Sequence, residues 1–187
     1  MIQLMEEVGV IKKGHFKLSS GRHADLYLQC ALIQQYPVLN KKVMQGLADF
    51  VQSFQPTLVI GAAVGGIVAA YELASLVHAR CIFAERVDGK LTFRRGFEIL
   101  PDDRIVLIED VITTAKTTLE LIELIQQHGH DPLAVVSLVD RRNLSESIPY
   151  PFQSAVKVQA VTWDAESCPL CKKQIPLDEP GSRRLKK

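Results

Sequence analysis

The sequence lacks an excess of either charge. Its 187 residues carry 22 lysines and arginines against 21 aspartates and glutamates, which leaves a formal net charge of +1. A chain this close to neutral has no global field that would draw it to nucleic acid or to an anionic membrane surface. Any anion site must therefore be local.

Long apolar runs are missing as well. No stretch reaches the ~18 to 20 residues that a membrane-spanning helix needs. The opening MIQLMEEVGVIKKG has neither the basic start nor the uninterrupted apolar stretch of a secretory signal. We expect a soluble, cytoplasmic chain with one hydrophobic core, because 187 residues suffice for one domain but not comfortably for two.

Cysteines are few, and only two of the four lie close together. Cys30 and Cys81 are isolated in apolar surroundings, whereas Cys168 and Cys171 form the motif SCPLCKK. One CxxC pair offers two ligands where a closed tetrahedral zinc site uses four, and no second pair or close histidine pair follows it. The sequence therefore predicts reduced structural thiols here, with metal binding or a redox role as the alternative.

From residue 37 onward, apolar strands alternate with amphipathic helices. Helical spacing occurs in PVLNKKVMQGLADFVQSF, IVAAYELASLVH and TTLELIELIQQHG, and strand patterns occur in PTLVI, ARCIFAE, RIVLIED, PLAVVSLVD and FQSAVKVQA. This order predicts an α/β fold with a mostly parallel central sheet of about five strands flanked by helices. The earlier GHFKLSSGRHADLYLQCALI has a polar turn between short alternating segments and predicts a small hairpin.

Two loops that follow expected strands have the composition of anion sites. The first, residues 61–66 (GAAVGG), lets backbone N–H groups approach a ligand at the start of a helix. The second, residues 113–117 (TTAKT), could surround a phosphate with amides and hydroxyls. A tight packing turn and threonine helix caps are the respective alternatives. A nucleotide P-loop is excluded, because Asp110 and Ala115 occupy its two glycine positions.

Two acids, Glu109 and Asp110, stand directly before the second loop, although carboxylates repel phosphate. Ionised carboxylates accept hydrogen bonds from hydroxyls. A ligand with vicinal hydroxyls close to its phosphate would therefore suit both the acid pair and the anion loop. Ribose 5-phosphate is such a ligand. The stretch therefore predicts a site for a phosphorylated sugar.

A charged segment, ERVDGKLTFRRGFEILPDDR, separates two expected strands without a helical pattern. It holds Arg86, Lys90, Arg94 and Arg95 around an Asp-Gly pair. A segment of this length and charge is either functional or a solvated hairpin, and composition leaves both open.

The stretch VLIEDVITTAKT resembles the 5-phosphoribosyl diphosphate (PRPP) signature of the type I phosphoribosyltransferases. Other segments resemble the orotate phosphoribosyltransferase family. The segment GHFKLSSGRHADLYLQCALI resembles its base-binding region, and FAERVDGKLTFRRGFEI resembles its mobile catalytic loop. The segment SLVDRR resembles the strand end that contacts orotate, and CPLCKKQIPLDEPGSR resembles the tail of one bacterial branch. The resemblance implies the type I phosphoribosyltransferase fold in a single domain. It consists of an N-terminal hood (1–36), a core (37–163) with a flexible catalytic loop, and a C-terminal tail (164–187).

The resemblance also implies a reaction: N1 of orotate attacks C1 of PRPP, giving orotidine 5-phosphate and diphosphate in UMP biosynthesis. It implies Mg2+ on the diphosphate and ribose hydroxyls, without a direct protein ligand, and a homodimer with shared active sites, in which the catalytic loop reaches the neighbouring subunit. The catalytic candidates are Lys90, Arg86 and Asp110. The substrate-binding candidates are Glu109, Asp110, Val111, Ile112, Thr113, Thr114, Ala115, Lys116, Thr117, Arg141, Tyr27, Ala63 and Gly65.

Each candidate has an implied role. Glu109 and Asp110 bind the ribose hydroxyls, residues 113–117 hold the 5-phosphate, and residues 61–66 face the diphosphate. Thr113 and Arg141 contact orotate, and Tyr27 lies against the pyrimidine. The alternative for Arg141 is an ordinary surface charge, and the alternative for Tyr27 is a half-buried strand tyrosine. Arg86 and Lys90 meet the leaving diphosphate in the transition state.

Three positions depart from the family's pattern. Ala115-Lys116 stands where glycines are common, the GAAVGG loop lacks a proline near its second position, and Ser19 replaces a PRPP-binding lysine of some members, with Lys17 nearby. Whether Lys116 adds a cation at the 5-phosphate or points to solvent is left open.

Two other functions compete. A purine phosphoribosyltransferase, for xanthine or adenine, is disfavoured by the SSGRHADLYLQ stretch. A non-catalytic regulator that senses PRPP is disfavoured because this near-neutral chain has no spare segment for a basic DNA-binding module.

Overall fold

The computed structural model describes residues 1–18, 20–142 and 147–180. Ser19 and the last residues of the expected tail, 181–187, lie outside this range. By its internal contacts the chain divides into two units. We call Cys30–Val158 together with Met1 the core unit, and Ile2–Gln29 with Gln159–Lys187 the terminal unit.

The core unit contains a six-stranded sheet in the order β5-β4-β3-β6-β7-β8. All neighbours are parallel except the antiparallel pair β4 and β5, so the predicted α/β class and mostly parallel sheet are confirmed. The sheet has one strand more than the five expected. The strands are β3 (Leu58–Ala62), β4 (Arg80–Val87), β5 (Lys90–Phe93), β6 (Ile105–Ile112), β7 (Pro132–Asp140) and β8 (Phe152–Lys157).

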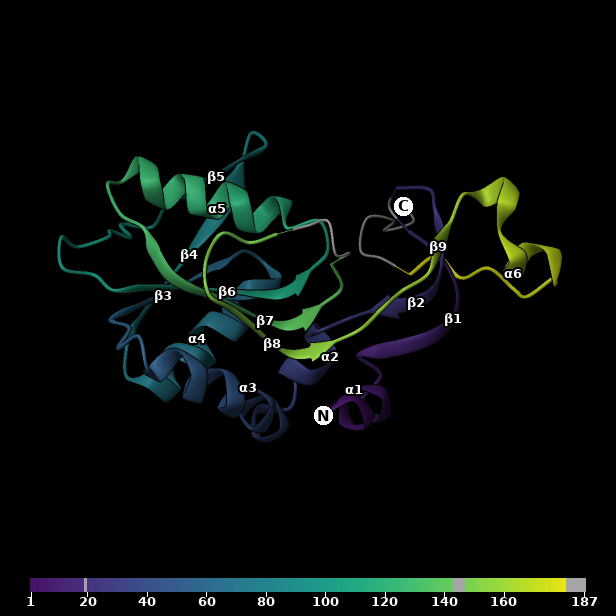
Figure 1. The fold of residues 1–187 in the computed structure, drawn as a ribbon, viewed down its shortest axis with the longest axis horizontal. Helices are drawn as coiled ribbons and strands as arrows, with labels where there is room; N and C mark the ends of the chain where they lie inside the picture. The colour runs from purple at the N-terminus through teal and green to yellow at the C-terminus, as the bar shows by residue number, and fades with distance from the viewer. Residues whose placement is uncertain (19, 143–146, 181–187) are drawn as a thin grey trace. The chain divides into compact units, whose positions relative to one another are not determined.

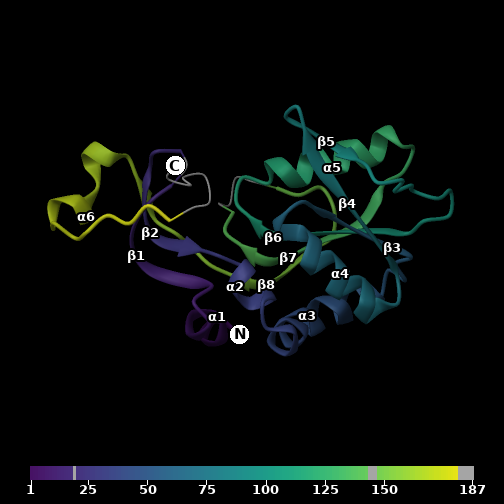
Figure 2. The same ribbon diagram turned by 180° about the vertical axis from the view of Figure 1, so that it is seen from behind.

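Helices cover both faces of this sheet. In both views α5 lies on one side, and α3 and α4 lie on the other (Figure 1, Figure 2). Apolar residues at helical spacing on α5, such as Leu121 and Ile125, pack on Ile105 and Leu107 of β6. The helices are α2 (Ala31–Gln34), α3 (Pro37–Gln52), α4 (Gly65–Val77) and α5 (Lys116–Gln127).

The register of the parallel strands brings the candidate loops to one edge. Gly61 of β3 pairs with Ile108 of β6, and Glu109 of β6 pairs with Ser137 of β7. The carboxyl ends of these strands therefore meet at the same edge of the sheet, the edge where open α/β sheets bind ligands.

The charged segment supplies the additional strand. Val87 pairs with Lys90 across a two-residue turn, in which Asp88 and Gly89 have φ angles of 48° and 83°. Positive φ at both central residues, in an Asp-Gly pair, is typical of the type I′ turn that closes tight hairpins. The backbone of this segment is thus a hairpin, and its catalytic role stays a prediction.

The terminal unit contains an antiparallel sheet in the order β1-β2-β9. The predicted N-terminal hairpin is confirmed by the pairing of β1 (Ile11–Lys17) with β2 (His23–Leu28). Strand β9 (Thr162–Trp163) pairs with β2, so the two ends of the chain share one sheet. The short helices are α1 (Ile2–Glu7), η1 (Ala165–Ser167) and α6 (Pro169–Lys172). Within the described ranges, no helix is both long and apolar enough to cross a membrane.

Candidate active site

Strand β6 presents its two acids to opposite faces of the sheet. Ile105 and Leu107 face α5, so the alternation of a strand places Glu109 on that face and Asp110 on the other. Asp110 lies against Gly65 at the start of α4, where a Cβ atom would collide with the carboxylate. The acid pair therefore connects the two candidate loops.

Glu109 is buried, with 6% of its surface exposed. Its Oε1 atom has no hydrogen-bond partner among the described residues. Burial and then the charge of Asp110 raise the pKa of Glu109 to about 8, against the lowering effect of Arg86. A buried carboxylate oxygen without a donor is unfavourable by itself, so this position favours a ligand that brings hydroxyls or positive charge.

Asp110 has a partial compensation for its burial. The backbone N–H of Val111 donates to Oδ1 at 2.8 Å. Burial nevertheless raises the pKa of Asp110 above its usual value, against the lowering effect of the backbone N–H groups of Val111 and Asp110. Both acids of the pair thus resist ionisation in the chain as described.

The loop that follows β6 leaves the start of α5 open. Ala115 is the N-cap residue, with φ 55° and ψ 8°, and makes no side-chain cap hydrogen bond. Threonine capping is therefore not what begins this helix. The first backbone N–H groups of a helix have no intrahelical partner and carry partial positive charge, so this end of α5 can receive an anion.

Two features of this loop bear on its departures from the family's pattern. The left-handed conformation of Ala115 is one that glycine adopts without steric penalty, which explains why glycine is common there in the family. The side chain of Lys116 is 80% exposed, with Nζ 3.9 Å from Glu120 Oε1. Lys116 thus points to solvent beside Glu120.

The GAAVGG loop makes close backbone contacts. A Cβ at Gly61 would lie 2.5 Å from the carbonyl oxygen of Gly66. The N–H of Ala63 donates to Ala84 O at 2.8 Å, and the Ala63–Val64 peptide bond is cis. Gly61 and Gly65 thus have no room for a side chain, which fits the tight packing turn as well as a loop that approaches a ligand closely.

Arg86 lies on the same face of the sheet as Glu109. Its Nη2 donates to Glu120 Oε2 of α5 at 2.6 Å, and its Nη1 donates to Gly89 O at 2.5 Å. These contacts tie the hairpin to α5, beside a groove of about 290 Å³ that Lys90 and Leu91 help to line. The other paired arginine of this segment, Arg95, binds Glu85 through two hydrogen bonds of 2.8 and 2.9 Å.

Two arginines follow β7. Arg142 donates from Nε to Asp140 Oδ1 at 2.9 Å, and its guanidinium carbon lies 4.1 Å from the centre of the Phe152 ring. Burial raises the pKa of Asp140, but hydrogen bonds from Arg142 bring it below its usual value. Arg142 thus has a structural role. Arg141 is half-buried and donates its backbone N–H to Ile112 O at 2.8 Å, which holds it at the end of β6.

Sequence reasoning missed two neighbours of the site. Gln34 of α2 donates from Nε2 to Gly65 O at 3.0 Å, and the thiol of Cys30 donates to Asp110 O at 3.4 Å. Burial, then the charge of Asp110, raises the pKa of this thiol strongly, so Cys30 is an inert structural group. No local pattern marks either residue, because both reach the site through tertiary packing.

Tyr27, the remaining candidate, lies on β2 of the terminal unit. Its ring centre is 5.7 Å from that of Phe16, and its hydroxyl donates to Gln29 Oε1 at 2.9 Å. The side chain is half-buried. This geometry fits a strand tyrosine with one face on its own unit.

Comparison with known proteins gives close relatives. The orotate phosphoribosyltransferase of Caldanaerobacter subterraneus subsp. tengcongensis is 45% identical over 185 residues, which cover 99% of this chain and 97% of the relative. That of Thermotoga maritima is 38% identical over 184 residues, or 98% of each chain. No family model matches the chain. These relatives confirm the resemblance that the sequence motifs indicated.

Solved structures show the same fold at lower identity. The orotate phosphoribosyltransferase of Aeropyrum pernix aligns with a TM-score of 0.67 at 22% identity, over 83% of this chain and 92% of the other. The adenine phosphoribosyltransferase of Thermoanaerobacter pseudethanolicus aligns with a TM-score of 0.62 at 12% identity, over 71% of this chain and 88% of the other. The predicted type I phosphoribosyltransferase fold is thereby confirmed.

Proposed function

Because the chain belongs to the orotate phosphoribosyltransferase family, we propose that it transfers the 5-phosphoribosyl group of PRPP to orotate. The products are orotidine 5-phosphate and diphosphate, a step of pyrimidine (UMP) biosynthesis. One observation carries the proposal: the buried pair Glu109-Asp110 at the end of β6, directly before an α5 whose N-cap residue makes no side-chain hydrogen bond.

The acids receive the ribose. A hydroxyl that donates to Glu109 Oε1 supplies the partner this buried oxygen lacks within the described part of the chain. Asp110, on the opposite face, accepts from the neighbouring hydroxyl. An ionised carboxylate is the stronger acceptor and has no proton to donate, so binding of PRPP favours the charged forms and lowers the raised pKa values of both acids.

Mg2+ fits the same surroundings. Two carboxyl groups that resist ionisation in the free chain gain from a nearby cation, and their oxygens suit a hard metal ion. When bound with PRPP, Mg2+ would supply positive charge to the departing diphosphate. Glu109 and Asp110 would hold the ribose hydroxyls.

Backbone groups bind the phosphates. The 5-phosphate lies at the start of α5, where the N–H groups of the first turn and the hydroxyls of Thr113, Thr114 and Thr117 surround it. The diphosphate faces the loop of residues 61–66. The missing side chain at Gly65 lets that loop approach Asp110.

Two cations stabilise the leaving group, in different ways. Arg86 lies on the face of the sheet that carries Glu109, and its charge lowers the pKa of that carboxyl group. Lys90 lies at the hairpin turn and, as the resemblance implies, serves the neighbouring subunit. Since orotate brings its own nucleophile, N1, the protein positions the reactants and stabilises charge in an oxocarbenium-like transition state.

Base recognition uses Arg141, whose guanidinium fork suits an anionic, planar ligand, together with Thr113. Arg141 is held near the loop of residues 113–117 because its backbone N–H donates to Ile112 O at the end of β6. We retain Tyr27 as a contact of the pyrimidine ring on the resemblance alone.

A homodimer belongs to the same proposal. Val64, Val68 and Tyr71 are 83%, 44% and 70% exposed on and beside α4. They adjoin a groove of about 510 Å³ that Ile67, Phe83 and Phe97 help to line. An exposed apolar stripe next to an apolar groove is typical of a protein interface. The hood, core and tail boundaries (1–36, 37–163, 164–187) and the cytoplasmic location are part of this proposal too.

The test is an assay of the purified chain with PRPP and Mg2+, in which loss of orotate absorbance is followed. Turnover of orotate is expected, with turnover of xanthine and adenine at background level. If a purine base is turned over and orotate is not, the chain is a purine phosphoribosyltransferase and the proposal is wrong. Binding of PRPP without turnover of any base would favour a regulator.

A further inference from the structure

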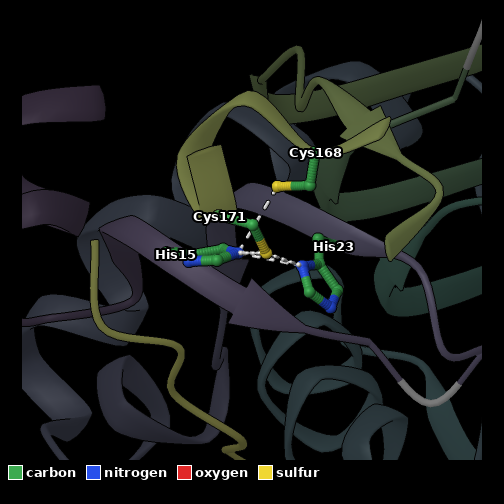
Figure 3. A group of neighbouring side chains, drawn as sticks. All are labelled: His15, His23, Cys168 and Cys171. Carbon is green, nitrogen blue, oxygen red and sulfur yellow. Dashed lines mark hydrogen bonds between the residues drawn. The ribbon is translucent and has the colours of Figure 1, made fainter. Parts of the chain in front are cut away.

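Four side chains of the terminal unit converge on one point. His15 comes from β1, His23 from the start of β2, and Cys168 and Cys171 from the N-cap and third residue of α6 (Figure 3). Their ligand atoms, one from each residue, all lie within 4.8 Å of one another. The cysteine pair that lacked partners in its own stretch of sequence thus finds two histidines from near the other end of the chain.

Four of the distances between these atoms lie within about 0.4 Å of those in a zinc tetrahedron. Zn–N and Zn–S bonds of about 2.05 and 2.3 Å place two nitrogens about 3.3 Å apart, and a nitrogen and a sulfur about 3.6 Å apart. His15 Nε2 and His23 Nδ1 are 2.9 Å apart. The nitrogen to sulfur distances are 3.4 Å from Cys168 to His15, 3.3 Å from Cys171 to His23, and 3.7 Å from Cys171 to His15.

Hydrogen bonding alone does not satisfy this cluster. His15 Nδ1 lies 2.8 Å from Ile175 O. A carbonyl oxygen only accepts, so Nδ1 carries the proton and Nε2 has a single lone pair. The two thiols and His23 Nδ1 all surround that lone pair, and Cys171 Sγ also contacts His23 Nδ1, so a single lone pair on His15 cannot serve every contact. A metal ion at the centre removes this conflict, because each of the four atoms then directs a lone pair to it.

The contact between His15 and Ile175 is itself typical of a metal site. A ligating histidine usually donates its other ring N–H to a carbonyl or carboxylate, which fixes the ring orientation. Burial supports the same interpretation: His15, His23 and Cys168 are 3%, 5% and 0% exposed, and only Cys171 faces solvent. Buried polar side chains without another role need such a partner.

We propose that His15, His23, Cys168 and Cys171 bind one Zn2+ ion in a closed, structural site. Two thiolates and two imidazoles in a tetrahedron are a set that zinc prefers, and four protein ligands leave no open position for catalysis. The proposal takes up metal binding, the alternative that the sequence left open for Cys168 and Cys171, and adds two histidine ligands.

The site adds a link between parts of the terminal unit that are also joined by the pairing of β9 with β2 and by backbone hydrogen bonds of Asp178 to His15 and Lys17. In its described residues, the large buried apolar side chains are Met5, Val10, Ile11, Phe16 and Leu26. A core of this size is marginal, and small units commonly add a metal or disulfide. The zinc ion connects the β1-β2 hairpin to the segment around α6, which follows it by more than 140 residues in the sequence.

Metal content is the primary test. The untagged full chain, purified without chelator, is expected to contain about one zinc per chain by mass spectrometry of the elements. Co2+ added to the metal-stripped chain should give the intense visible bands of tetrahedral cobalt and a thiolate charge-transfer band. Zinc far below one per chain together with a weak octahedral Co2+ spectrum would overturn the proposal. So would a Cys168–Cys171 disulfide in the intact mass of the freshly purified protein.

Matched variants locate the site. Cys171→Ser and His23→Gln should reduce zinc content roughly tenfold or more. Cys81→Ser and His128→Gln should retain it, because Cys81 lies in the core unit and His128 makes only a comparable ring contact to a carbonyl, Leu124 O at 2.8 Å. Retention of zinc by both ligand variants would refute the assignment. If a variant does not fold, the zinc content and the Co2+ spectrum of the wild-type chain decide whether the proposed zinc site exists.

Discussion

Replacing Glu109 by glutamine should stabilise the free chain and disable the enzyme. The side chain is buried, one of its oxygens lacks a donor among the described residues, and burial raises its pKa from 4.5 to about 8. Glutamine keeps the shape and removes the charge. It also removes an acceptor that the ribose hydroxyl needs, so kcat/KM for PRPP should fall.

The sign of the effect follows from the direction of the pKa change. In the unfolded chain Glu109 loses its proton near pH 4.5, whereas in the folded chain it keeps the proton up to about pH 8. Between these values the folded state binds the extra proton, so the free energy of unfolding of the wild type falls as pH rises. At ~1.4 kcal/mol for each pH unit, the full effect is about 5 kcal/mol, and relaxation of the site reduces it to about 2 to 4 kcal/mol.

Urea unfolding followed by circular dichroism between pH 5 and pH 9 measures the difference between Glu109→Gln and wild type. The difference should grow with pH in favour of the variant and level off above about pH 8. The buried amide of glutamine adds a constant that does not change with pH. Glu123→Gln, an exposed change on α5, is the control, with the same small difference expected at every pH. A difference for Glu109→Gln that is flat, or that falls with pH, would refute the reasoning.

Four further changes test the rest of the site. Gly65→Ala places a Cβ against the carboxylate of Asp110. It should lower the free energy of unfolding by about 1 to 3 kcal/mol and weaken PRPP binding. The control is Gly46→Ala, in open space on α3, which should raise the free energy of unfolding by about 0.5 to 1 kcal/mol. Ala115→Gly should raise the melting temperature, because glycine adopts the left-handed conformation freely; a lower value would contradict this. Lys90→Ala should lower kcat far more than it weakens orotate binding, and an unchanged kcat would move the role to another cation. Tyr71→Glu should convert a dimer into a monomer in light scattering, and a dimer that persists would exclude α4 from the interface.

The sequence predicted the core of the fold and site because both depend on local patterns. Alternating strands and helices specify the parallel sheet, and the position of Glu109 and Asp110 at a strand end places them at its carboxyl edge. The loop before α5 follows directly, since a helix must begin there. Each of these inferences uses residues that are neighbours in the chain.

The rest depends on contacts between distant residues or on short elements. The Asp88-Gly89 pair is a strong turn signal, yet the surrounding charges left its hairpin unresolved from the sequence. Strand β9 has two residues, too few for any periodicity. The cluster with Cys168 joins residues more than 140 positions apart, so no spacing rule finds it. The conformation of Ala115 opposes its residue type, which no propensity predicts.

Departures from local structural rules gather at one edge of the core unit. The Oε1 atom of the buried Glu109 has no donor among the described residues. Ala115 has the left-handed conformation at a helix start where a Ser, Thr, Asp or Asn cap would stabilise. Gly65 leaves the space beside a carboxylate without a side chain. Stability alone would select against the first two. Their concentration within a few residues of one strand end therefore indicates selection by a ligand. In the proposed function, a ribose 5-phosphate would restore what the free chain lacks: donors for the carboxylates and an anion for the helix.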